Sequence, residues 1–259
     1  MKMCPKIFRI VLVSLIVILI FSMGTNTGVV LSQDAIRIPD DVPGPPYVLD
    51  QAGETYILTK DITTPATAII VNANNITLDL NGKIITFDTA LIGGPNYADS
   101  KHGVKVTKLA DGFCLTNAVT QEAVIRQAGQ EGTGGVRDGC VFINNPSNNV
   151  IIGNDAQHPI TLIFNGKGSG GVTSETGSWN YFRTNGMLIY GLEIKYITTK
   201  SDVVEKWGTN YLEGGVVLAA PKNTNVHHNT FTYLNANGIG GMANAVSIFG
   251  GETIQLHDN

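Results

Sequence analysis

Two adjacent histidines, His227 and His228, stand in the segment NVHHNTF at residues 225–231, and a similar segment ends in His257 and Asp258. If the two segments are successive copies of one repeat, His257 lies over His227 and Asp258 lies over His228. Two imidazoles and a carboxylate on one outer face could act as a general base or bind a metal ion. His227, His228 and His257 are therefore candidate catalytic residues.

A plainer interpretation is that these are solvated surface residues, because outer positions of a stacked repeat lie over one another whatever their type. We expect no zinc site here. The histidine pair lacks the third protein ligand that a catalytic zinc needs, and the chain has no H-E-x-x-H motif.

Four aromatic residues suggest carbohydrate binding. Trp179 and Tyr181 lie in the polar stretch 166–183, and Trp207 and Tyr211 lie in the polar stretch 200–214. Flat aromatic rings stack on the C–H faces of sugars, so these four are candidate substrate-binding residues. Packing of the two loops onto the rest of the protein is the alternative.

A short repeat must position these residues. The pattern apolar-x-apolar, followed a few residues later by Asn or a substitute and another apolar residue, recurs five times. A β-branched strand with a small residue at its start usually precedes it. The five copies begin at Ile76, Val150, Met187, Thr224 and Ile254.

Each such strand is too short to form a sheet alone and buries only alternate residues, whereas stacked copies bury them in one core. Asparagine at the bends tolerates left-handed conformations, and stacked asparagines can bond one another. The sequence therefore predicts an all-β right-handed parallel β-helix. We expect a lead-in at 33–52 and the β-helix domain at 53–259. Loop insertions are expected near 88–138, 166–183 and 200–214. Because Asn259 is a bend residue, the helix is expected to be incomplete at its C-terminus.

The first 32 residues predict export. A start with three basic and no acidic residues precedes an aliphatic run at 10–22 and then small residues, which is typical of a signal peptide over 1–32. An uncleaved anchor is the alternative. We expect a secreted or cell-envelope protein with no membrane contact after cleavage. Cys114 and Cys140 could then form a disulfide, although two cysteines make no disulfide framework.

The charge balance bears on partners. The whole chain has a net charge of −4 despite its basic start, which argues against nucleic acid, because phosphate binding needs a basic face. A polysaccharide or other extracellular glycan is the expected partner, and the protein is expected to be a monomer.

Residues 53–87, GETYILTKDITTPATAIIVNANNITLDLNGKIITF, resemble the opening coils of the parallel β-helix proteins of the pectate-lyase-like superfamily. The segments GMLIYGLEI and NTNVHHNTF are similar to its generic repeat. The resemblance covers about residues 47–259 and is weakest over 88–138. It implies the fold more than one activity, because the same repeat serves lyases, glycosidases, epimerases, phage tailspikes and adhesins.

Lyases of this superfamily typically use an Arg or Lys base, often with calcium held by carboxylates, to remove a proton beside a carboxyl group. The resemblance therefore implies Lys222 and Asp202 as candidate catalytic residues, with Lys195, Lys200 and Lys206 nearby, and calcium as a possible cofactor. No spacing identifies calcium ligands, and solvated loop charges are the alternative.

The motifs of the related polygalacturonase-like hydrolases are missing. NTN at 223–225 stands where those enzymes have Asn-Thr-Asp, the Asp40-Asp41 pair precedes the coils, and the Gly-His-Gly and Arg-x-Lys motifs are absent. A glycosidase needs two carboxyl groups across one groove, and the sequence identifies no such pair.

The favoured interpretation is an exported β-helix protein that binds or degrades polysaccharide, with a groove only partly contained in this chain. The alternative is a non-enzymatic cell-surface or adhesion β-helix. Basic groups and carboxylates stacked on the outside of one sheet would favour the enzyme, whereas an outer face of Thr, Asn and Ser would favour the adhesin.

Overall fold

The computed structural model describes residues 35–90, 100–108, 110–128, 138–144, 146–165, 170–174, 184–197, 212–234 and 242–259. Residues 36–259 form one compact unit, and its described part contains strands but no helix. Accordingly, no described helix could cross a bilayer. The predicted signal peptide at 1–32 lies outside the described residues.

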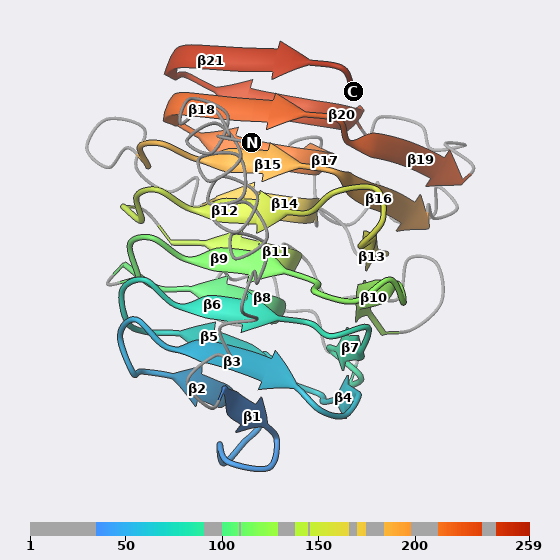
Figure 1. The fold of residues 1–259 in the computed structure, drawn as a ribbon. Helices are drawn as coiled ribbons and strands as arrows, with labels where there is room; N and C mark the ends of the chain where they lie inside the picture. The colour runs from blue at the N-terminus through green and yellow to red at the C-terminus, as the bar shows by residue number, and fades with distance from the viewer. Residues whose placement is uncertain are drawn as a thin grey trace, which may run out of the picture. The chain divides into compact units, whose positions relative to one another are not determined.

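The strands form three entirely parallel sheets, stacked from β1 to β21 in Figure 1. The eight-stranded sheet has the order β1-β3-β6-β9-β12-β15-β18-β21. Its strands are β1 (Ile36–Ile38), β3 (Thr55–Leu58), β6 (Thr77–Asp79), β9 (Cys114–Thr116), β12 (Ile151–Gly153), β15 (Leu188–Tyr190), β18 (Lys222–His227) and β21 (Glu252–His257).

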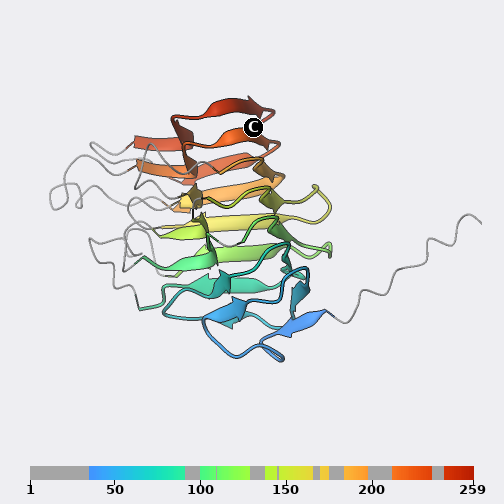
Figure 2. The same cartoon turned by 90° about the vertical axis from the view of Figure 1, so that its left-hand side faces the viewer.

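The other two sheets run in the same order along the stack, as Figure 2 shows from the side. The seven-stranded sheet contains β2 (Tyr47–Leu49), β5 (Ile69–Val71), β8 (His102–Val106), β11 (Gly139–Ile143), β14 (Gly170–Ser174), β17 (Leu212–Ala219) and β20 (Met242–Phe249). The six-stranded sheet contains β4 (Ile62–Thr63), β7 (Ile84–Phe87), β10 (Ala123–Gln127), β13 (Ile160–Phe164), β16 (Leu192–Ile197) and β19 (Thr230–Leu234).

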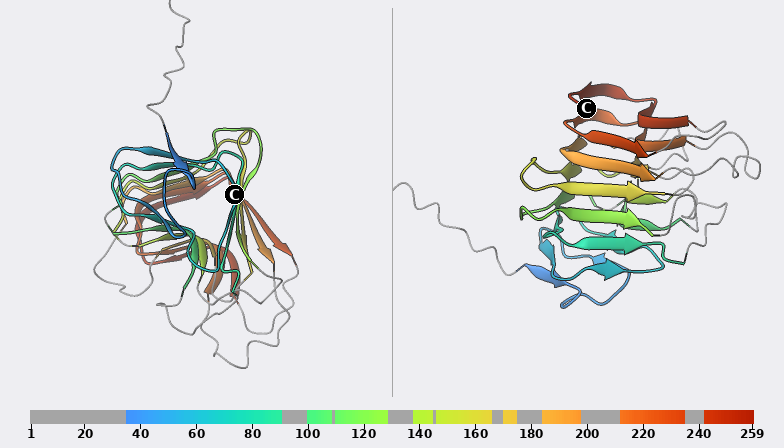
Figure 3. Two further views of the ribbon diagram at one scale, coloured as in Figure 1. Left: turned by 90° about the horizontal axis from the view of Figure 1, so that it is seen from below. Right: turned by 90° about the vertical axis from the view of Figure 1, so that its right-hand side faces the viewer.

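From β2 to β19, every coil visits the seven-, eight- and six-stranded sheets in that order, and β20 and β21 begin one more coil. Viewed along the stack, the strands of each sheet superimpose (Figure 3, left). This is the predicted right-handed parallel β-helix, and the fold prediction is confirmed.

The core consists of columns of inward-pointing side chains at equivalent positions of successive coils. In the eight-stranded sheet, one column runs through Leu78, Leu115, Ile152, Ile189 and Val226, each paired with the next and each 0% exposed. Burying one such side chain contributes roughly 1.5–3 kcal/mol. Because every coil covers the one below it, the short strands are stable only as a stack.

The bend into the eight-stranded sheet repeats a left-handed residue. Asn75, Gly112, Asn149, Gly186 and Asn223 occupy its equivalent position in five successive coils, with φ of 56°, 71°, 54°, 76° and 48°. Asparagine and glycine are the residues that adopt this conformation at least cost. Glycine at position 186 also avoids a close approach, because a Cβ there would lie 2.6 Å from Asn149 Oδ1.

The residues just before these bends form a ladder of side-chain-to-backbone hydrogen bonds, whereas the sequence predicted that stacked asparagines bond one another. Asn74 Oδ1 accepts from the backbone N–H of Asp111 at 2.9 Å, and Asp111 Oδ1 accepts from that of Asn148 at 2.8 Å. Asn148 Oδ1 accepts in turn from the N–H of Asn185 at 3.2 Å. Each side chain thus satisfies a backbone donor of the next coil.

The expected domain details need correction. Residues 102–127, within the expected insertion 88–138, form β8, β9 and β10 and so make a complete coil. The expected lead-in 33–52 already contributes β1 and β2, and the insertion 166–183 contains β14. Strands of three to five residues with irregular spacing give too weak a periodic signal to be recognised singly. Most of the insertion 200–214 lies outside the described residues.

The two cysteines are not paired. Cys140 is buried, with its Sγ 3.3 Å from the carbonyl oxygen of Ile163, and Cys114 lies on the eight-stranded sheet. Burial raises the pKa of both thiols. The possible disulfide is therefore not formed in this structure.

Candidate functional site

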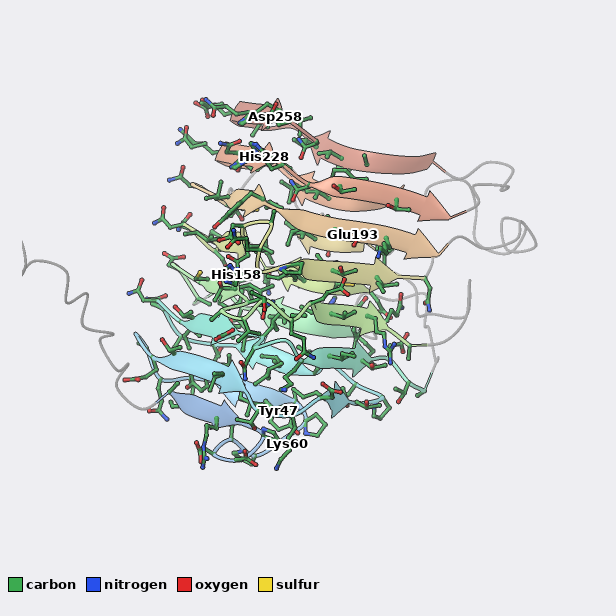
Figure 4. All side chains as sticks on the ribbon, turned by 45° about the vertical axis from the view of Figure 1, so that its right-hand side comes forward. Tyr47, Lys60, His158, Glu193, His228 and Asp258 are labelled. Carbon is green, nitrogen blue, oxygen red and sulfur yellow. The ribbon has the colours of Figure 1, made fainter. Side chains whose placement is uncertain are left out.

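The three candidate histidines lie together at the ends of β18 and β21. His227 pairs with His257 in register, so the expected stacking of the two segments is confirmed. His228 and Asp258 follow as equivalent left-handed residues, with φ of 54° and 52°. Figure 4 labels both on successive coils. Their local fold is the same, and the stack alone brings them near one another.

Short contacts link the four side chains of this histidine cluster, His227, His228, His257 and Asp258. His227 Nδ1 lies 2.7 Å from His228 Nδ1, and His257 Nδ1 lies 2.8 Å from Asp258 Oδ2. His228 Nε2 is 3.9 Å from the same Asp258 oxygen. The side chains of His228, His257 and Asp258 are 63%, 47% and 64% exposed. The cluster can therefore reach a dissolved ligand.

Ring stacking orients two of the imidazoles. The His227 ring lies between Tyr190, with centroids 5.4 Å apart, and His257, with centroids 5.0 Å apart and planes within 2°. Partial burial and the two neighbouring imidazoles lower the pKa of His227. The hydrogen bond with His257 lowers the pKa of Asp258. Together these effects favour a neutral His227 beside an ionised carboxylate.

The other candidates do not join this cluster. Lys222 lies at the opposite end of β18, where its Nζ is 3.4 Å from Glu252 Oε1. Lys195 lies on β16 and pairs with Glu193. The remaining sequence-predicted residues lie outside the described residues: Trp179, Tyr181, Lys200, Asp202, Lys206, Trp207 and Tyr211.

A second group, of which the sequence indicated only Lys195, lies on the outside of the six-stranded sheet. The Thr161 hydroxyl contacts Glu122 Oε1, one coil below, and Glu193 Oε2, one coil above, the latter at 3.4 Å. Lys195 Nζ lies 2.9 Å from Glu193 Oε1. Arg126 is exposed and donates to Thr86 Oγ1 at 3.0 Å. We call Glu122, Arg126, Thr161, Glu193 and Lys195 the charged face.

Strand register aligns four residues of the charged face, and Glu122 contacts Thr161 from just before β10. Thr161 pairs with both Val124 and Glu193, while Ile163 pairs with both Arg126 and Lys195. The outward positions thus form two columns that cross three coils. Glu193 and Lys195, at alternate positions of β16, were a sequence signal, and this signal is informative only once the strands are aligned.

Two carboxyl groups also meet inside the corner between β7, β10 and β11. Asp88 and Asp138 are hydrogen-bonded to each other and each is 1% exposed. Gln127 Nε2 donates to Asp88 Oδ2 at 3.1 Å and to Asp138 Oδ2 at 2.8 Å. Burial and the Asp88 carboxyl raise the pKa of Asp138 to about 9, although the N–H of Lys101 donates to it. Asp138 is therefore protonated at neutral pH.

This buried pair is structural. Glycosidases hold their two carboxyl groups about 5 Å apart or more, so that a sugar or a water fits between them. Directly bonded carboxyl groups leave no such room and instead share a proton. The pair satisfies buried polar atoms at a corner of the helix.

His102 is a further buried titratable group, at the start of β8. Its ring stacks on Phe142 with centroids 4.4 Å apart, and its Nδ1 accepts from the backbone N–H of Gly139 at 3.2 Å. Burial lowers the pKa of His102 to about 3, so this imidazole is neutral over the physiological range.

The calcium implied by the family resemblance finds no fitting ligand set among the described residues. The one group of three or more potential metal ligands there is His228, His257 and Asp258. Calcium takes six to eight oxygen ligands, whereas this group offers two nitrogens and a carboxylate. We therefore assign no step to calcium.

Comparison of the chain with protein-family models, curated proteins and solved structures gives no significant match. The parallel β-helix thus rests on the structure itself.

Proposed function

We propose that the chain is an exported β-helix protein that binds or degrades polysaccharide, and that the charged face is its carbohydrate site. The observation that carries this proposal is the shared contact of Glu122 and Glu193 with one threonine hydroxyl. Basic groups and carboxylates stacked on one sheet are the feature that favours an enzyme over an adhesin.

The separation of the two glutamates suits glycoside hydrolysis. Two oxygens within hydrogen-bonding reach of the same hydroxyl are at most about 7 Å apart. Glycosidases hold their carboxyl groups about 5–5.5 Å apart when they retain configuration and about 6.5–9.5 Å apart when they invert it. This upper limit is compatible with the separation of a retaining glycosidase.

Different surroundings suggest different roles for the glutamates. Lys195 Nζ lies 2.9 Å from Glu193 Oε1, and we assign Glu193 the role of nucleophile or base. Glu122 makes no ion pair among the described residues, so it is the remaining carboxyl group for the second role. Glu122 would then act as the general acid toward the leaving oxygen.

The same face can hold an extended chain. Arg126 and Lys195 stand in one column two coils apart, which is about 9.6 Å at the usual strand spacing. Ile163 between them offers an apolar surface to a sugar ring. Hydroxyl or carboxylate groups spaced along a polysaccharide could thus contact both cations.

Matched glutamate variants test the proposal. Plant, algal and bacterial polysaccharides would be incubated with the chain and assayed for new reducing ends and for unsaturated products by absorbance near ~235 nm. Glu122→Gln and Glu193→Gln are each expected to reduce cleavage at least about 100-fold, the scale of one acid–base group. The control Glu252→Gln, on the eight-stranded sheet, should retain activity. Cleavage that survives both substitutions would refute the assignment.

A non-enzymatic binding protein is the second candidate. Threonines flank the charged face on both sides, with Thr63 paired to Thr86 below it and Thr230 and Thr232 paired to Glu193 and Lys195 above it. Such a face can bind a glycan through hydroxyls without cleaving it. Retention of a polysaccharide by the chain, with no product formed, would favour this candidate.

A further inference from the structure

We propose that His228, His257 and Asp258 form a binding site for a divalent transition-metal ion of the zinc class. This site lies on the eight-stranded sheet and does not depend on the carbohydrate site proposed above. The sequence argued against zinc because a pair of adjacent histidines lacks a third ligand. The stack supplies that ligand, since it brings His257 and Asp258 of one coil to His228 of another.

The spacing of the three ligands fits one small ion. One ligand atom from each residue lies within 4.8 Å of the others. Asp258 Oδ2 is 2.8 Å from His257 Nδ1 and 3.9 Å from His228 Nε2. Ligands bonded at about 2.0–2.1 Å around a tetrahedral zinc stand about 3.4 Å apart. The ligand atoms therefore need to shift by only about 1 Å to reach the spacing of a zinc site.

The donor types select the class of metal. Two imidazole nitrogens and one carboxylate oxygen suit zinc, nickel and copper better than magnesium or calcium, which prefer oxygen ligands. All three side chains are about half exposed or more, so water can occupy the remaining position. The carboxylate also supplies the negative charge that offsets part of the charge of the ion.

His227 is placed to support the site without contacting the ion. Its Nδ1 lies 2.7 Å from His228 Nδ1, and only one hydrogen can lie between these two nitrogens. If His228 donates that hydrogen, its Nε2 becomes the free ligand. Metal-bound histidines commonly donate their other nitrogen to such a partner. The His227 ring also stacks on His257 within 2° and so holds the second ligand.

Zinc titration of the untagged chain, followed by calorimetry, tests the proposal. The wild type is expected to show a single saturable site. His228→Ala, His257→Ala and Asp258→Asn are each expected to weaken binding at least about tenfold. The matched control is His158→Ala, because His158 Nδ1 pairs with Asp155 Oδ1 at 2.7 Å but has no second histidine in its pair. This variant should bind zinc as the wild type does.

Two further measurements separate the site from nonspecific binding. His227→Phe keeps an aromatic ring in the stack but removes the acceptor, and it is expected to weaken binding by about tenfold. Zinc binding by the wild type should weaken as pH falls, because metal ligands bind in their deprotonated form. Thermal melts without metal would check that the variants are folded.

The proposal is overturned by absence of saturable zinc binding in the wild type. It is also overturned if folded His228→Ala and Asp258→Asn bind as tightly as the wild type, or if His158→Ala loses as much affinity as they do.

Discussion

Replacing Asp138 by Asn should change how the stability of the β-helix depends on pH. In the folded chain, burial and Asp88 raise the pKa of Asp138 to about 9, whereas an unfolded aspartate titrates near 3.8. Between these values the folded state keeps a proton that the unfolded state has lost. The free energy of unfolding therefore falls as pH rises, by about 1.4 kcal/mol per pH unit for one proton.

His102 opposes this trend at lower pH. Burial lowers the pKa of His102 to about 3, so between about pH 3 and its ordinary value of 6.5 the unfolded state binds the extra proton. As pH rises through this range, the stability gained through His102 therefore offsets the stability lost through Asp138. Above pH 6.5 only the Asp138 effect remains, until the two cysteines begin to ionise in the unfolded chain at about pH 8.5.

The informative window is therefore pH 6.5 to 8. The wild type is expected to lose about 2 kcal/mol across it, and Asp138→Asn should lose almost none. The variant amide no longer accepts from Gln127, which costs about 1–3 kcal/mol at every pH. The quantity to compare between the two proteins is thus the slope of the free energy of unfolding against pH, rather than the free energy itself.

Urea unfolding at four pH values in this window, followed by tryptophan fluorescence, measures the slope. Asp155→Asn is the control, because the pKa of the exposed Asp155 is lowered and its contribution changes only below about pH 4. Parallel pH profiles for the wild type and Asp138→Asn would refute the shared-proton description of the buried pair.

Three further predictions concern the coil itself. Gly191→Ala should destabilise far more than Gly250→Ala in thermal melts. Their φ values are 64° and 65°, but a Cβ at Gly191 would overlap the carbonyl oxygen of Asn154 whereas one at Gly250 meets no atom within 4 Å; equal losses would contradict this. Leu115→Ala should cost about 2–5 kcal/mol in urea unfolding, and Leu256→Ala, at a position 53% exposed, less than about 1 kcal/mol. Asn229→Ala should lower the free energy of unfolding by about 2 kcal/mol or more, because the Asn229 side chain is 2% exposed and its amide donates to two backbone carbonyls. An unchanged midpoint of urea unfolding would show that water replaces the amide in these bonds.

The sequence by itself determined the repeat. Alternating apolar residues and bend asparagines such as Asn75 and Asn149 are local features, and local features suffice to predict a stack of parallel strands. They also gave the register of the last two coils, and hence the pairing of His227 with His257, because the two segments are alike and close in sequence.

Only the tertiary structure decided which distant residues meet. Glu122 and Glu193 contact one hydroxyl, and Asp88 and Asp138 share a proton, although many residues separate the members of each pair. Such contacts depend on the number of residues in the bends and loops of each coil. The alternation of apolar residues does not encode that number, so the columns become visible only when the backbone hydrogen bonds between coils fix the register.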